Sequence, residues 1–194
     1  MTDRQQLIAS RRKVLEASFG VAVAVGVGAS GGALAQTVSL SSIDSGAKNM
    51  RSSTFTYLSY MRAAPHRVWA AFIDPEVQKR IWLGHFFETS WQAGASWRMI
   101  AADGRTANSG EIVGIDPPHH LVLTWRNDIY PERIVEGYSS AVLKLEAAEG
   151  ATRFTVTHAI GRPDSKLIAA ASGSWPLVLS NLKSVLETGH PALG

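Results

Sequence analysis

The sequence contains no cysteine. No disulfide can form, so the packing of side chains alone must hold the fold. The absence also removes thiol nucleophiles and every metal site built on cysteine ligands. The six histidines are scattered along the 194 residues, and their spacing predicts no metal site, no cofactor and no catalytic constellation.

An excess of charge of one sign is also lacking in most of the chain. Residues 1–35 hold four of the 19 basic and two of the 16 acidic residues, so residues 36–194 carry 15 bases, 14 acids and a net charge of +1. A chain with no basic stripe has little attraction for phosphate backbones. We therefore expect no nucleic-acid partner.

Long apolar runs are missing too. A membrane-spanning helix needs roughly 20 apolar residues, whereas the apolar run at residues 19–29 is only 11 residues long and is diluted by glycine and alanine. We expect no permanent membrane span.

What precedes and follows this run indicates an export signal. Arg11 and Arg12 stand before it, and Ala33-Leu34-Ala35 after it forms a small-residue cleavage pattern. This arrangement is typical of a twin-arginine signal peptide. The sequence predicts a signal over residues 1–35, a twin-arginine translocase as export partner, and a periplasmic or secreted protein. Polar residues 36–53 are expected to form a flexible linker.

Two other interpretations of the same segment stay open. An uncleaved signal would act as a membrane anchor. Residues 26–31 also match the G-x-G-x-x-G pattern of dinucleotide-binding loops. That pattern requires a helix opening at its third glycine, and the glycine- and serine-containing residues that follow indicate none.

Residues 54–190 alternate between strand and helix patterns and are expected to form one domain. Pro65 and Pro75 are suited to the first turn of two short helices, ending near residues 73 and 82. A long helix is expected to start at residues 174–176 and to end at Gly189. Strands are predicted over residues 54–61, 97–101, 110–115, 120–126, 139–146 and 152–158.

Alternation along these strands predicts how the sheet is covered. Leu121, Leu123 and Trp125 share one face of their strand, opposite polar neighbours. A strand with one apolar and one polar face belongs to an antiparallel sheet covered on one side. The long C-terminal helix carries the matching apolar stripe, so the fold class is α+β, with helices on one face of the sheet.

The domain resembles bacterial proteins similar to the C-terminal domain of the activator of Hsp90 ATPase, within the START-like, helix-grip (SRPBCC) superfamily. The resemblance covers roughly residues 54–189, and it implies a curved antiparallel sheet wrapped around a long C-terminal helix with an internal apolar cavity. It is carried chiefly by Ala64-Pro65-x-x-Val68-Trp69, Phe72-x-Asp74-Pro75-Glu76, Trp91-x-x-Gly94-x-x-Trp97, Asp116-Pro117-Pro118-x-x-Leu121-x-x-Thr124-Trp125 and Thr152-Arg153-Phe154-Thr155-Val156-Thr157-His158.

Superfamily members bind hydrophobic molecules in such a cavity, and a few catalyse reactions there. The segment at residues 160–173 is expected to lie over one mouth of the cavity. His158 faces inward by strand parity, and it is interpreted either as a buried histidine satisfied by a backbone carbonyl or as a ligand contact or acid/base. The residues expected on the cavity wall are Trp82, Phe86, Trp97, Met99, Trp125 and His158.

The function expected from the sequence is that of an exported protein that holds a small hydrophobic ligand in this cavity. Two alternatives stay open: a cavity enzyme of cyclase or hydrolase type, and a chaperone-type protein-interaction module. The export signal argues against Hsp90 itself as the partner, because members of the family are usually cytoplasmic.

Overall fold

The computed structural model describes residues 52–193. The expected signal peptide and residues 36–51 of the expected linker lie outside the described residues. Within residues 52–193, no helix combines the length and the apolar character needed to cross a membrane.

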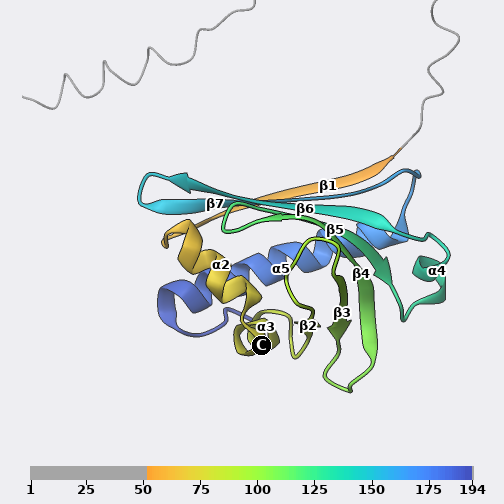
Figure 1. Ribbon diagram of the computed structural model, residues 1–194, viewed down its shortest axis with the longest axis horizontal. Coiled ribbons are helices and arrows are strands. Elements are labelled where there is room, and N and C mark those ends of the chain that lie inside the picture. The colour runs from red at the N-terminus through yellow and green to blue at the C-terminus, as the bar shows by residue number, and fades with distance from the viewer. Residues whose placement is uncertain (1–51, 194) are drawn as a thin grey trace, which may run out of the picture. The chain divides into compact units, whose positions relative to one another are not determined.

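A seven-stranded sheet forms the body of the domain, in the order β1-β7-β6-β5-β4-β3-β2 with every neighbouring pair antiparallel. The sheet curves, and Figure 1 shows β4 and β3 turning down beside the long helix while β1, β7 and β6 lie above it. Register shifts in β3–β4 and β4–β5 pairing fall where bulges bend strands. The strands are β1 (Ser53–Met61), β2 (Phe86–Glu88), β3 (Ser96–Ile100), β4 (Thr106–Asp116), β5 (His120–Asn127), β6 (Ser139–Ala148) and β7 (Ala151–Ile160).

Three short helices connect the strands: α2 (Pro65–Ile73), α3 (Pro75–Ile81) and α4 (Pro131–Ile134). The side chain of Asp74 accepts hydrogen bonds from the backbone N–H groups of Glu76 and Val77, both at 2.9 Å. This is the capping that an aspartate before a proline predicts. The helices at residues 65 and 75 therefore form where the sequence places them.

The long helix α5 (Lys166–Thr188) begins earlier than the sequence predicts. Ser165, not Ser174, caps it, by accepting a hydrogen bond from the N–H of Ile168 at 3.1 Å. Pro176 lies inside the helix, although proline there removes one backbone hydrogen bond. The buried side chains of Leu167, Ile168 and Ala171 hold the extra turns against the domain. Residues 166–173 are therefore helical, and only residues 161–165 of the expected segment 160–173 form the connection between β7 and α5.

The core lies between the concave face of the sheet and α5. Leu121, Leu123 and Trp125 are all buried, as their alternation predicts. On α5, Leu179 and Leu182 are fully buried against them. The structure confirms an α+β fold with a curved antiparallel sheet packed on a C-terminal helix.

Candidate functional site

One end of the space between the sheet and α5 is a pocket of about 340 Å³. Its walls come from β3, β4, β5 and β7, from the loop after α3, from the segment through α4, and from the N-terminal half of α5. The lining residues are Trp82, Leu83, His85, Met99, Ala107, Asn108, Trp125, Asn127, Ile129, Tyr130, Arg133, His158, Leu167, Ala170, Ala171, Ser174, Trp175, Leu177 and Val178.

Three tryptophans make up the aromatic wall of this pocket. Trp82 lies 5.1 Å from Trp175 and 6.2 Å from Trp125 between ring centroids, and Trp125 lies 5.8 Å from Trp175. These are the separations of rings in tilted or edge-to-face contact. Each ring comes from a different element, so the wall exists only in the folded domain.

Four of the six residues expected on the wall line the pocket: Trp82, Met99, Trp125 and His158. Trp97 does not. It lies behind Trp125, 4.7 Å away between ring centroids, with 1% of its surface exposed. Its Nε1 donates a hydrogen bond to the backbone oxygen of Thr124 at 3.1 Å. Trp97 therefore supports the wall from the core side.

Phe86 also lies away from the pocket, because its neighbour Phe87 takes the inward position in the short strand β2. Phe87 is 4% exposed and packs on Trp82 and Trp97. Phe86 is half-buried on the other face of the strand, where the amine of Lys79 lies 5.3 Å from its ring centre. The strand β2 has only three residues, so the alternation of its side chains in the sequence does not show which phenylalanine points inward.

His158 is buried and both of its ring nitrogens are in use. Nδ1 accepts a hydrogen bond from Trp175 Nε1 at 3.3 Å, since an indole N–H can only donate. The hydroxyl of Ser139 donates to the backbone oxygen of Trp125 at 2.8 Å. Nε2 of His158 therefore donates to the Ser139 oxygen, 2.8 Å away.

The ring of His158 is consequently neutral, with its proton on Nε2. Burial lowers its pKa from 6.5 to about 4, because a charged ring would lose its hydration. Of the two interpretations of the sequence, the geometry matches a buried histidine with satisfied hydrogen bonds. Its partners are the side chains of Ser139 and Trp175, not the expected backbone carbonyl.

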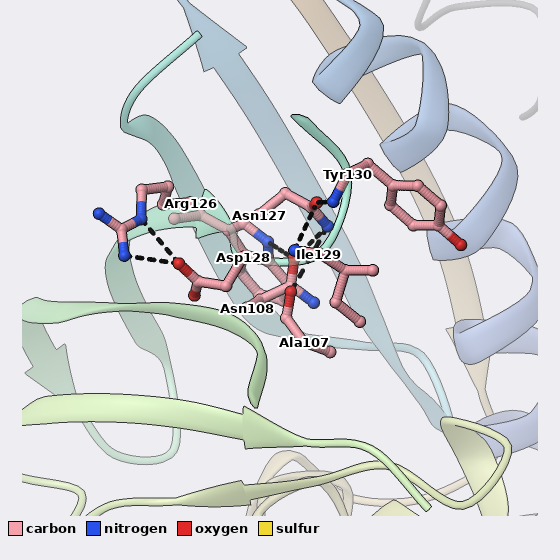
Figure 2. A network of polar contacts seen from close by, with 8 residues as sticks. Ala107, Asn108, Arg126, Asn127, Asp128, Ile129 and Tyr130 are labelled. Atoms are coloured by element: carbon pink, nitrogen blue, oxygen red, sulfur yellow. Dashed lines mark hydrogen bonds and ion pairs between the residues drawn. The ribbon is translucent and has the colours of Figure 1, made fainter. Parts of the chain in front are cut away.

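A network of amides shapes the polar end of the pocket (Figure 2). The Oδ1 of Asn108 accepts from Trp125 Nε1 at 3.1 Å and from Asn127 Nδ2 at 3.2 Å. The Oδ1 of Asn127 accepts the backbone N–H groups of Ile129 and Tyr130 at 3.2 and 2.8 Å. Asn127 thus fixes the turn that leads into α4.

No pattern in the sequence indicates that Asn108 and Arg133 line a pocket. Asn127-Asp128 followed by Pro131 is a turn-then-helix signal that would have located α4. Nothing local to Asn108 shows that β4 brings it beside Trp125, because that placement depends on strand register.

Residues 160–173 are expected from the sequence to lie over the mouth of the cavity, but in the structure part of this segment forms a wall of the pocket. Leu167, Ala170 and Ala171 line it as part of α5. The N-terminus of α5 is capped by Glu136, whose carboxylate accepts the N–H groups of Lys166 and Leu167 at 2.8 and 3.2 Å. Burial alone would raise the pKa of Glu136. These two hydrogen bonds and one from Ser165 outweigh burial, so the pKa of Glu136 is lowered overall.

A curved antiparallel sheet that holds a long C-terminal helix is the arrangement of the helix-grip class of proteins, and this chain has it. Residues 62–187, more than half of the chain, match the family model described as Activator of Hsp90 ATPase homolog 1-like protein. The chain belongs to this family.

Solved structures show the same fold at low sequence identity. A protein from Mesorhizobium loti is 18% identical, with a TM-score of 0.60 over 70% of this chain and 97% of the other. The Aha1 dimer from Colwellia psychrerythraea is 16% identical (TM-score 0.58, 71% and 98%). CalU16 from Micromonospora echinospora is 18% identical (TM-score 0.56, 70% and 77%). No curated protein gives a significant match.

Proposed function

We propose that this protein is an exported binding protein that holds a small hydrophobic molecule in the pocket between the sheet and α5. The observation that carries the proposal is the aromatic wall of Trp82, Trp125 and Trp175 around a pocket of about 340 Å³. Ligand pockets typically measure roughly 300–1,000 Å³ and are mostly apolar with a few polar groups. This pocket is at the small end of that range, so it suits a compact ligand.

The geometry favours binding over catalysis. His158 is the buried titratable group in the pocket, and its two nitrogens are already engaged by Ser139 and Trp175. With a pKa of about 4, it is a poor proton acceptor at neutral pH. An acid/base needs a pKa near the working pH and access to the reacting atom.

A titration with N-phenyl-1-naphthylamine, a neutral fluorescent probe, tests the proposal. We expect saturation near one probe per chain, and native mass spectrometry should detect a small molecule that co-purifies. Trp125→Ala should weaken probe binding by about tenfold, because it removes apolar contact surface. Phe86→Ala is the matched control and should leave the affinity unchanged. A folded protein that binds neither probe nor native ligand contradicts the proposal.

Export is the second part of the proposal and depends on Arg11 and Arg12, outside the described residues. A twin-arginine translocase carries proteins that have already folded, which suits a domain with no disulfides to form.

A second candidate function is supported by exposed apolar side chains around α4. Tyr130, Ile134, Val135 and Tyr138 are 47%, 39%, 78% and 56% exposed. Apolar side chains gathered on one surface can mark protein contacts, and one structural neighbour is an HSP90 activator from Plasmodium falciparum (22% identity, TM-score 0.55). Binding of a protein client that is lost in Val135→Asp, with probe binding retained, would favour this role.

A further inference from the structure

The pocket lining is unbalanced in charge. None of the lining residues is aspartate, glutamate or lysine, and Arg133 is the one permanent charge among them. Two histidines also line the pocket: burial keeps the ring of His158 neutral, and His85 donates from Nδ1 to the backbone oxygen of Trp82 at 2.9 Å. A hydrophobic ligand without an anionic group would therefore leave a guanidinium at the pocket with nothing to neutralise it.

Arg133 forms no ion pair within residues 52–193. The acidic groups of its own segment are engaged elsewhere or exposed. Asp128 is paired with Arg126 through Oδ1 at 2.5 Å, and its buried Oδ2 has no partner and forms no ion pair with Arg133. Glu136 caps α5, and Glu132 is exposed. The guanidinium of Arg133 instead lies over the ring of Tyr130, 4.2 Å from its centre, which holds it at the partly exposed rim of the pocket.

The hydrogen bonds of the lining show the same imbalance. Three buried side-chain polar atoms in residues 52–193 have no partner, and two of them, Trp82 Nε1 and Arg133 Nε, are donors on lining residues. The amide oxygens of Asn108 and Asn127 each already accept two hydrogen bonds. The pocket therefore has two hydrogen-bond donors without a partner, whereas the amide oxygens of both asparagines already have partners. Unpaired buried donors are costly, so a ligand acceptor gains from meeting them.

We infer that the ligand combines an apolar, compact body with an anionic acceptor, a carboxylate in the simplest case, and that Arg133 binds this group. The inference rests on the proposed function, because it names the ligand class of the same pocket. The body packs against Trp82, Trp125 and Trp175, and the carboxylate lies at the rim beside Tyr130 and Arg133. Arginine suits this role because its planar guanidinium matches the two oxygens of a carboxylate.

Two probes of the same size test the inference: 2-naphthoate, which is an anion at neutral pH, and 2-naphthamide, which is neutral. Their affinities are measured by calorimetry on the purified protein, with N-phenyl-1-naphthylamine as an independent probe of the pocket. We expect naphthoate to bind about tenfold more tightly than naphthamide, the usual gain from a charge-assisted hydrogen bond. Arg133→Gln should remove this preference, and Arg133→Lys should keep part of it.

Arg67→Gln is the control, since Arg67 is exposed on α2, away from the pocket lining, and its loss changes the net charge equally. It should leave both affinities unchanged. Equal binding of the two naphthyl probes by the unsubstituted protein overturns the inference while the proposed function stands. A preference that survives in Arg133→Gln also overturns it. Failure of all three probes to bind overturns the proposed function, and the inference with it.

Discussion

At the scale of single residues, His158 shows how a polar group is kept inside an apolar core. Its ring is held between the hydroxyl of Ser139 and the indole of Trp175, so no hydrogen-bonding capacity is wasted. The same burial makes the protonated ring unfavourable. The residue is therefore neutral in the fold, but below about pH 6.5 it takes up a proton once the chain unfolds.

This difference predicts that acid weakens the fold before the carboxylates titrate. Between pH 6.5 and about 4 the unfolded chain binds a proton at His158 that the folded protein does not. The free energy of unfolding should fall as the pH drops through that window, by about 3 kcal/mol in all from this residue. Urea unfolding at several pH values measures it. His158→Gln keeps a donor and an acceptor and should reduce the slope. An NMR titration that places the pKa near 6.5 would contradict the prediction.

Gly110 on β4 lies so close to β5 and Trp97 that there is no room for a side chain at this position. A Cβ atom there would lie 1.9 Å from the backbone oxygen of Thr124 and 2.9 Å from Trp97 Nε1. Those two atoms form the hydrogen bond that holds Trp97 behind the pocket wall.

Gly110→Ala should therefore force β4 and β5 apart and break this bond, with a loss of stability of about 1–3 kcal/mol, as for overpacked cores. Thermal unfolding measures the loss. Gly114→Ala is the matched control on the same strand, because a Cβ there meets only Val122, at 4.0 Å. Equal melting temperatures for the two variants would be inconsistent with the close contact.

At the scale of elements, α5 gives the core more buried apolar side chains than any other helix in residues 52–193. Leu179 and Leu182 are fully buried, while Leu186, one turn further on, is only partly buried. The helix ends at Gly189, whose φ of 84° is left-handed, as the sequence predicts.

Leu182→Ala should lower the free energy of unfolding by about 2–5 kcal/mol, because a buried leucine leaves a cavity when truncated. Chemical denaturation measures the change. Leu186→Ala provides the comparison on the same helix and should cost clearly less. If the two variants have the same unfolding midpoint, the helix does not pack as described.

The elements also show what the sequence could establish. Strand alternation and proline positions located β1, β3 to β7, α2 and α3, because those signals are local. The sequence places the start of α5 too late because Pro176 mimics a first-turn proline, while the Ser165 cap depends on contacts with Glu136. Asn108 and Arg133 reach the pocket through strand register and the turn at Asn127, and Phe87 reaches the core behind Trp82. These placements depend on tertiary structure.

At the scale of the whole molecule, the proposed export signal lies outside the described residues. Replacing both Arg11 and Arg12 with lysine should keep the protein inside the cell, because the twin-arginine translocase reads that pair. Cell fractionation measures this. Replacing Arg4 alone is the control and should leave export intact. Mass spectrometry of the exported protein should find Gln36 as its first residue, and a retained segment 1–35 would contradict cleavage.

The tryptophan cluster also has an optical consequence. Trp97 and Trp125 lie 4.7 Å apart between ring centroids and are tilted by 55°, and Trp82 and Trp175 stand close by. Strong indole transitions at such distances couple as excitons and add a pair of bands of opposite sign to the far-ultraviolet circular dichroism. Helix content read from that spectrum would therefore be distorted. The same bands report directly on the pocket wall, and they should change when a ligand enters or when Trp97 is replaced by phenylalanine.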